Sequence, residues 1–361
     1  MATKPEGPLR KGWTTGACAT AATTAAFTAL ATGRFPDPVT ITLPRGEEPS
    51  FALVRAELEH GVATASVIKD AGDDPDITHG AEIVVTVRMG APGSGVVFAA
   101  GPGVGMVTKP GLPIPAGEPA INPRPREMMV SAVAQIAARH GIPGDVILEV
   151  GVTNGAALAE QTWNPRLGIL GGLSILGTTG VVIPYSCSAW IHSIHRGIDV
   201  ALATGLDHVA GATGRTSEVT VQKLHGLSDG AMLDMGDFAG GMLKYLRRHP
   251  VPRVTIGGGF GKLVKLAQGE MDLHSSRSQV DHAVLAGLAR DAGADAALVD
   301  AVAGATSAGE VLGLAQAAGV PLADVVAARA REAALAVLSG GVAIDVVVID
   351  RAGAIVGRAG P

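Results

Sequence analysis

Aromatic residues are scarce in this chain, making up 3% of its 361 positions. A hydrophobic core must therefore be built mainly from Ala, Val, Leu and Ile, and aromatic platforms for stacking single-stranded nucleic acid are nearly absent. The formal net charge of -5 also gives no basic excess for binding DNA or anionic lipid. Both shortages argue against a nucleic-acid partner, and the charge argues against a membrane-surface role.

Cysteine and long apolar runs are scarce as well. Cys18 and Cys187 are the only cysteines, so the sequence has neither a disulfide framework nor a four-cysteine zinc site. The residues before Gly12 lack the apolar stretch of a signal peptide, and no later segment has about 18 uninterrupted apolar residues. We therefore expect a cytoplasmic protein without a membrane span.

Glycine and proline are plentiful, with 50 and 22 residues, but they are scattered between periodic segments. This distribution excludes collagen-like and low-complexity chains and predicts many loops. With 47% hydrophobic residues, the chain is long enough for one large domain or two ordinary domains with real cores.

The first part of the chain predicts an α+β domain over residues 1–125 with a mainly antiparallel sheet. A small-residue helix is expected over 17–32, with Thr14 or Thr15 as its N-cap and Gly33 as its end. β-branched segments separated by Gly and Pro turns follow it. The expected strands are 39–43, 51–58, 62–67 and 83–89.

From Arg126 onward the pattern alternates between helix and strand, which predicts an α/β domain over 126–361 with a mainly parallel sheet. We expect a boundary near Arg126. Residues 279–338 read as Ala- and Leu-rich helices, and a strand pair closes the chain. The sequence leaves open whether residues 279–361 pack back on the first domain.

Two segments of the first domain carry candidate chemistry. Thr14 and Thr15 precede a helix, whose N-terminal N–H groups can hold a carboxylate or phosphate, although plain capping explains them as well. Cys18 lies in the first turn, where the pKa of a thiol could fall; a packing role is the alternative. In the second segment, Asp70, Asp73 and Asp74 follow a strand. Clustered carboxylates can bind a metal or supply a base because repulsion raises one pKa, but turn chemistry also accounts for them.

Cations in Gly- and Pro-rich loops predict a clamp for a polycarboxylate. Lys109, Arg124 and Arg126 lie in such loops, and arginine can grip a carboxylate with two hydrogen bonds. An ordinary linker is the alternative interpretation, but it leaves the three cations unexplained. Residues 162–180, which include Arg166, interleave glycines with apolar residues, so that backbone could lie close to a flat ligand; tight packing of the chain itself is the alternative.

A third glycine-rich segment, 257–262, follows a strand and opens a helix, as anion and nucleotide sites do. It lacks Walker A spacing and a Ser or Thr after Lys262, so ATP hydrolysis is disfavoured. No strand is followed by G-x-G-x-x-G, and a Rossmann dehydrogenase gains no support. Residues 211–214 are the nearest substitute for a nucleoside loop. The histidines have no metal-site spacing, and we expect no protein-bound metal.

Taken together, these segments resemble the cobalt-precorrin-5B C(1)-methyltransferase family of the anaerobic cobalamin route. The resemblance runs from Leu9 to about Asp281, and its most specific motifs are GWTTG at 12–16, ASVIKDAGDDPD at 65–76, VTKPGL at 107–112, GEPAINP at 117–123, NPRLGI at 164–169 and GTTG at 177–180. It implies S-adenosylmethionine as methyl donor, a cobalt-precorrin tetrapyrrole as acceptor and a fold that is not a standard Rossmann methyltransferase.

On the family interpretation, the site residues fall into three groups. The candidates for the acceptor's carboxylate arms are Thr14, Thr15, Lys109, Arg124, Arg126, Arg166, Lys262 and Lys265. The candidates for the donor are Thr178, Thr179, Gly180, Gly211, Thr213, Gly214 and Glu218. The catalytic candidates are Asp70, Asp73, Asp74 and His274. A histidine that the family has ahead of Gly261-Lys262 is absent, because Gly259-Phe260 stands there.

Two rival functions stay open on the sequence. A non-catalytic tetrapyrrole carrier would need the basic loops but no donor pocket. A phosphate-ester enzyme would use the 257–262 loop on a nucleotide. The sequence does not decide between a monomer and a homo-oligomer.

Overall fold

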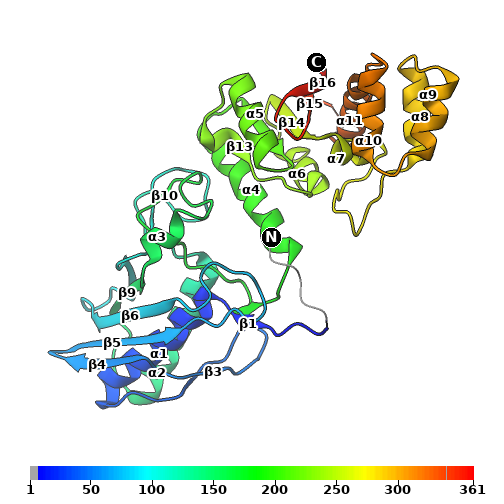
Figure 1. Ribbon diagram of the computed structural model, residues 1–361. Coiled ribbons are helices and arrows are strands. Elements are labelled where there is room, and N and C mark those ends of the chain that lie inside the picture. Colours follow the sequence, from blue (N-terminus) through cyan, green and yellow to red (C-terminus); the bar gives the residue numbers. More distant parts are fainter. Residues whose placement is uncertain (1–6, 339) are drawn as a thin grey trace. The chain divides into compact units, whose positions relative to one another are not determined.

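The computed structural model describes residues 7–338 and 340–361, and these form two compact units that meet in sequence between Ser186 and Cys187 (Figure 1). Each unit has a hydrophobic core of its own.

The N-terminal unit is an α+β structure. Its elements are β1 (Gly12–Trp13), α1 (Thr15–Thr32), β2 (Val39–Thr40), β3 (Ser50–Phe51), β4 (Arg55–Glu59), β5 (Val62–Ile68), β6 (Glu82–Met89), β7 (Val96–Ala100), β8 (Met106–Val107), α2 (Pro123–His140), β9 (Val146–Val152), α3 (Gly155–Ala159), β10 (Ile169–Leu170) and β11 (Val181–Val182).

The main sheet of this unit has the strand order β4-β5-β6-β9-β7, and only the β7–β9 pair is parallel. Along β6, Ile83, Val85 and Val87 are buried while the residues between them are not, as expected when one face of a sheet is covered. Helices α1 and α2 supply that cover (Figure 1). The predicted antiparallel character is confirmed.

Helix α1 is the helix that the sequence predicted; it begins at Thr15, two residues earlier than expected, and has the predicted cap and end. The Thr14 side chain caps it by accepting a hydrogen bond from the N–H of Ala17, and Gly33 ends it in the left-handed conformation at φ 77°. Its small residues let it pack against α2 and the sheet at once, and Phe27 is fully buried.

The boundary predicted near Arg126 is wrong. Helix α2 packs on α1, and β9 is hydrogen-bonded between β6 and β7, so residues 123–152 belong to the N-terminal unit. Their buried side chains complete a core that begins at Ala17. The division falls instead at the start of the next helix.

The C-terminal unit is an α/β structure. Its elements are α4 (Cys187–Ala203), β12 (His208–Ala212), α5 (Arg215–His225), a 3-10 turn (Asp229–Ala231), β13 (Met232–Leu233), α6 (Ala239–Leu246), β14 (Arg253–Gly259), α7 (Phe260–Ala267), α8 (His282–Asp291), α9 (Ala296–Gly304), α10 (Ala308–Ala317), α11 (Leu322–Leu338), β15 (Ala343–Ile349) and β16 (Ile355–Ala359).

Its sheet has the order β13-β12-β14-β15-β16, in which only the last pair is antiparallel. Alternate residues of β15 face opposite cores: Val346 and Val348 join the cluster of α4, α6, α7 and α11, whereas Val347 and Ile349 join Val221 of α5. Helices therefore cover both faces of the sheet. The predicted mainly parallel sheet is confirmed, and residues 279–361 complete the core of this unit.

Candidate functional site

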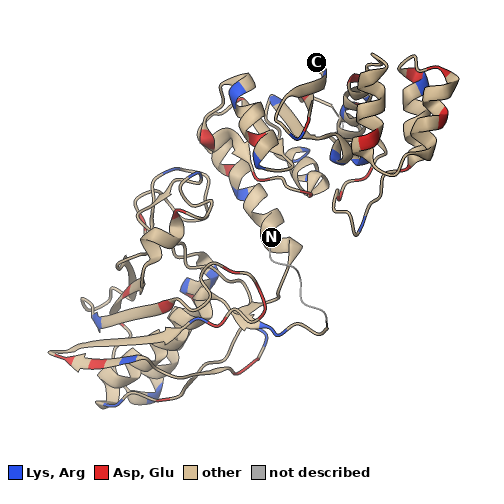
Figure 2. Ribbon diagram, in the orientation of Figure 1, with Lys and Arg blue, Asp and Glu red and all other residues tan. Residues whose placement is uncertain are grey.

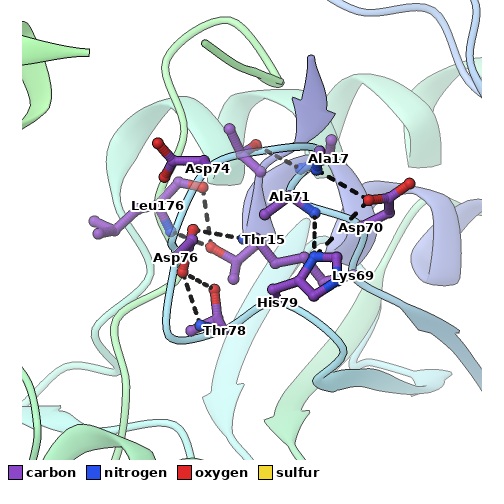
Figure 3. Close-up of polar contacts among 12 residues, drawn as sticks. Thr15, Ala17, Lys69, Asp70, Ala71, Asp74, Asp76, Thr78, His79 and Leu176 are labelled. Carbon is purple, nitrogen blue, oxygen red and sulfur yellow. Dashed lines mark hydrogen bonds and ion pairs between the residues drawn. The ribbon is translucent and has the colours of Figure 1, made fainter. Parts of the chain in front are cut away.

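The Thr14-Thr15 turn is held by the segment that carries the predicted donor residues Thr178 to Gly180. The N–H of Thr14 donates to the carbonyl of Gly180 at 2.9 Å, and the Thr15 hydroxyl exchanges hydrogen bonds of 3.1 and 2.9 Å with the backbone of Leu176 (Figure 3). A Cβ at Gly177 would lie 2.2 Å from the Thr14 hydroxyl oxygen. The structure thus brings these predicted residues together and gives both threonine hydroxyls structural partners.

The aspartate loop meets the same turn. The N–H of Trp13 donates to the carbonyl of Asp70 at 2.7 Å, and a Cβ at Gly12 would lie 2.0 Å from the carbonyl carbon of Ala71. The loop also holds the entering chain, because Asp73 accepts a hydrogen bond of 2.6 Å from the N–H of Arg10. Backbone contact this close is open only to glycine.

The three catalytic candidates of this loop face different partners. Asp70 accepts two hydrogen bonds from the guanidinium of Arg10, which lowers its pKa to about 2. Asp74 accepts the N–H of Tyr185 at 2.7 Å. The expectation that repulsion raises a carboxyl pKa is therefore wrong for Asp70, because cationic and N–H donors outweigh the neighbouring carboxylates.

An ion pair between a buried lysine and a partly exposed aspartate holds the base of the loop (Figure 3). Lys69, 1% exposed, places its ammonium 2.6 Å from Asp76, and Asp76 also accepts hydrogen bonds from the backbone and hydroxyl of Thr78. Burial raises the pKa of the Cys18 thiol to about 12, with a smaller opposing effect from Lys69. Cys18 is thus a packing residue, and the idea that its pKa falls is wrong because desolvation exceeds the helix-terminus effect.

Lys109 and Arg166 lie on adjoining segments of the N-terminal unit. Strands β8 and β10 pair antiparallel, and the Lys109 ammonium lies 3.4 Å from the carbonyl of Arg166. The Arg166 guanidinium lies over the ring of Trp163 at 4.2 Å. Two of the predicted acceptor cations are therefore brought close together.

The guanidinium of Arg126 binds other residues of this chain. Its guanidinium donates to the carbonyls of Ile121 and Pro119 and to the carboxylate of Glu118, and it lies 5.1 Å from the ring of Phe98. These contacts fasten the proline-rich loop to α2, so its role is structural. Arg124 is exposed and pairs with Glu127 one turn along α2.

In the C-terminal unit, the predicted donor loop follows β12 at the carboxyl edge of the parallel sheet. Thr213 donates its N–H to the carbonyl of Gly257 on β14, and a Cβ at Gly258 would lie 2.8 Å from the Thr213 side chain. Gly214 begins α5, and Gly259 begins α7 from the neighbouring strand; neither helix has a side-chain cap. Two helix N-termini with open N–H groups thus meet at adjacent strand ends.

Gly211 has a different role from the one predicted. It is buried, and a Cβ there would lie 2.4 Å from the sulfur of Met242. The residue is glycine because α6 packs directly on β12. Glu218 lies one turn into α5, behind Gly214, where its N–H donates to the Gly214 carbonyl at 2.9 Å.

The ammonium groups of the two lysines of α7 also bind other residues of this chain. Lys262 pairs with Asp237, and both Lys262 and Lys265 donate to the carbonyl of Leu273 at 3.1 Å. Burial lowers the pKa of Lys265, followed by repulsion from Lys262. They position the segment that leads to His274, which is exposed and bonded to Ser276. Their partners are residues of this chain and not an acceptor.

One acidic residue at this edge was missed by the sequence interpretation. Asp234 follows β13, one position beyond the register pair Gly211–Leu233, and its carbonyl accepts a hydrogen bond of 2.7 Å from the indole of Trp190. Two residues later, the N–H of Gly236 donates to the carbonyl of Ala212 at 3.0 Å, which ties this loop to β12. The sequence does contain a signal for this residue. Asp234 lies twenty residues after Gly214, in a segment ordered as strand, glycine loop, helix and strand, and nucleotide-binding folds have their ribose-binding acid at about this spacing.

Two family models match the sequence. The model described as CbiD matches residues 2–184, and the model described as CbiD, C-terminal domain, matches residues 272–360. The chain belongs to the CbiD family.

Relatives of this CbiD chain are similar along almost their full length. A protein of Paramagnetospirillum magneticum is 63% identical over 355 residues, covering 98% of this chain and 99% of its own, and one of Brucella anthropi is 60% identical over 351 residues, covering 97% and 95%. Both bear the name cobalt-precorrin-5B C(1)-methyltransferase. A crystal structure of the cobalamin biosynthesis protein (cbiD) of Archaeoglobus fulgidus is 27% identical, with a TM-score of 0.41 over 76% of this chain and 86% of that one.

The CbiD chain carries charged residues of both signs. Lys and Arg occur together with Asp and Glu in both units (Figure 2). Within residues 7–338 and 340–361, no group of three or more His, Cys, Asp or Glu side chains is placed to hold a metal ion. None of the helices in those ranges combines the length and apolar character that a membrane span needs.

Proposed function

We propose that this chain transfers a methyl group from S-adenosylmethionine to C1 of cobalt-precorrin-5B, giving cobalt-precorrin-6A in the anaerobic route to cobalamin. The observation that carries the proposal is the 63% identity, over 98% of the chain, to a relative that bears this name. Cobalt belongs to the acceptor and is part of the substrate. Both cysteines are free, which supports a cytoplasmic location.

We place the donor at the carboxyl ends of β12 and β14. In open α/β sheets, ligands bind where the strand order reverses, and β12 is the first strand of this sheet with its second and third on either side. This order also differs from that of the six-stranded Rossmann sheet, which supports a fold distinct from the standard Rossmann methyltransferases.

The residues at that edge fit a nucleoside that carries an amino-acid group. The open N–H groups at Gly214 and Gly259 suit a carboxylate, and Gly258 lets the Thr213 side chain pack directly on β14, which holds the loop at this edge. We propose Asp234, the residue after β13 at the same edge of the sheet, as the partner of the ribose hydroxyls. In this proposal Gly214, Gly259 and Asp234 contact the donor, whereas Gly211, which packs against α6, does not.

The acceptor's carboxylate arms require cations, and in the N-terminal unit we propose Lys109, Arg124 and Arg166 for them. Thr178, Thr179 and Gly180 of the N-terminal unit are the alternative donor segment, and Glu218, one turn after Gly214, stays a donor candidate at the β12 edge. Asp73, Asp74 and His274 remain catalytic candidates.

The reaction asks the protein mainly for alignment and exclusion of water. The bound sulfonium supplies an activated methyl group, and methyl transfer is an in-line displacement in which positive charge disperses. Few proton-transfer groups are needed. Asp70, with a pKa of about 2, is a poor proton acceptor at neutral pH, so we assign it to holding Arg10.

Calorimetric titration with S-adenosylhomocysteine tests the donor site. We expect saturable binding by the wild-type chain and about tenfold weaker binding by Asp234→Asn, since a hydrogen bond to a charged group contributes roughly 1.5–3 kcal/mol. Asp300→Asn, an exposed aspartate on α9, is the matched control and should bind as the wild type does. Absence of nucleoside binding together with binding of a cobalt-precorrin would replace the methyltransferase by a tetrapyrrole carrier.

A further inference from the structure

A groove lies on the C-terminal unit between α5 and the turn that joins β15 to β16. Its volume is about 770 Å³, within the range of small-molecule sites. One wall is a single face of α5, and the other is the turn at Gly353 with the start of β16. The Thr220 hydroxyl donates to the carbonyl of Gly353 at 3.0 Å, which fixes the two walls against each other. We call this site the α5–turn groove.

The groove is lined by apolar side chains that the fold leaves in water. Val219, Leu224 and Ile355 are 56%, 36% and 42% exposed, and all three line it. The opposite face of α5 is the packed one, where Ser217 and Val221 are buried against the sheet. Single exposed apolar residues are ordinary, but three in one concave site are typical of ligand recognition.

Two cations stand in the same groove. Arg215 lies at the first turn of α5 and Lys223 two turns later, about 12 Å along the axis. In the part of the chain that the structure describes, neither makes an ion pair. The nearby carboxylate of Asp350 is turned into the β15–β16 turn, where it accepts the N–H groups of Ala352 and Ala354. The charge left facing the groove is therefore positive.

A flat apolar ring with carboxylates on its rim matches this surface. The apolar side chains suit the ring plane, and the cations at the ends of the helical face suit the carboxylates. We propose that the α5–turn groove, in place of the N-terminal cations Lys109, Arg124 and Arg166, binds the tetrapyrrole acceptor, an assignment that rests on the proposed function. Arg215 directly follows Gly214, so the groove begins where the donor loop ends.

Equilibrium titration of the full chain with cobyrinic acid, a cobalt corrinoid with free carboxylates, tests the assignment. Cobinamide, whose side chains are amides, is the uncharged comparison. We expect Val219→Asp to weaken cobyrinic acid binding at least tenfold, because it places a carboxylate against the ring and its acidic arms. The Arg215→Gln/Lys223→Gln double variant should weaken it three- to tenfold and reduce its salt dependence, with little change for cobinamide.

Matched controls separate this site from general effects of charge. Val284→Asp changes a 42%-exposed valine on α8, and Lys244→Gln removes an exposed lysine on α6; both should bind cobyrinic acid as the wild type does. Thermal unfolding of each variant confirms that it is folded. If both groove variants bind cobyrinic acid with wild-type affinity, the assignment is wrong. If their oligomeric state changes as well, the groove is instead the contact surface for a second copy of this chain.

Failure of the groove and failure of the proposed function give different results. In one outcome, the wild type binds S-adenosylhomocysteine and transfers methyl while the groove variants bind cobyrinic acid normally. That result would contradict the groove assignment alone. If the wild type instead binds no nucleoside, and Val219→Asp loses corrinoid binding, the groove is the site of a tetrapyrrole carrier and the methyltransferase function is contradicted.

Discussion

The carboxylate of Asp345, on β15, is fully buried and is balanced by groups from several strands and a helix. Arg358 donates two hydrogen bonds to it at 3.0 Å, and the imidazole of His225 lies at 2.8 Å. Thr255 links the carboxylate to His208, with distances of 3.4 and 2.8 Å. These residues cluster toward the amino ends of β12 and β14, away from the proposed donor loop.

Replacing Asp345 with Asn should lower the free energy of unfolding of the C-terminal unit. An amide keeps the shape but leaves the guanidinium of Arg358, and that of Arg253 at 3.7 Å, without a counter-charge. Breaking a buried pair costs about 3–5 kcal/mol, and the partial exposure of both arginines reduces this to about 2–4 kcal/mol. Urea unfolding measures the change, and Asp300→Asn should be neutral. A stability equal to that of the wild type would show that the Asp345 ion pairs add no net stability.

The same cluster predicts a loss of stability in acid. Burial lowers the pKa of His208 to about 4 from an ordinary value of 6.5, followed by repulsion from Arg253 and His225. Between those two values the unfolded chain binds a proton that the folded chain does not, so stability is full above pH 6.5 and falls as pH drops toward 4. The lowered pKa of His225 acts in the same pH range, and the lowered pKa of Asp345 adds a loss of stability only below its ordinary value of 3.8.

Melting temperatures between pH 7.5 and 4.5 measure this dependence. His208→Gln keeps a hydrogen-bonding side chain beside Thr255 without a titrating group, so its melting temperature should fall less steeply. Parallel curves for the variant and the wild type would remove His208 from the explanation.

At the scale of elements, β1 and α1 begin where the chain passes against the aspartate loop. Gly72 has φ +67°, and a Cβ there would lie 2.1 Å from the carbonyl oxygen of Arg10. Gly72→Ala should therefore lower the stability of the N-terminal unit by about 3 kcal/mol or more, since left-handed strain alone costs roughly 1–2 kcal/mol. Gly80→Ala is the matched control, because φ is +77° and no atom lies within 4 Å. Equal losses in the two variants would mean that the close approach adds nothing.

Elements with local signals could be predicted from the sequence. Thr14 and Gly33 set the ends of α1 by their own chemistry, and the strand-rich and alternating regions gave the right sheet types. The start of helix α5 has no such local signal, because Arg215 follows a glycine loop without a capping side chain. The partners of Arg126 and Lys262 could not be read from the sequence, because folding brings Phe98 and Asp237 to them.

At the scale of the whole molecule, each unit closes a core from its own residues. The N-terminal core draws on side chains between Ala17 and Ile175, and the C-terminal core on side chains between Ile194 and Val348. Domains with complete cores can fold alone. The place where the chain is cut therefore decides whether a fragment keeps its core.

We expect residues 187–361 expressed alone to fold, and residues 126–361 to aggregate. The longer fragment carries most of α2 and all of β9 without α1 and β6, which leaves Met129, Val133 and Ile136 without their packing partners. Size-exclusion chromatography and thermal melting compare the two, and monodisperse, cooperatively melting samples of both would contradict the division. The 187–361 fragment should also bind S-adenosylhomocysteine within about threefold of the full chain, because Thr213, Gly214 and Asp234 all lie in it. Loss of binding in a folded fragment would move the donor site toward Thr178 to Gly180, which the cut removes.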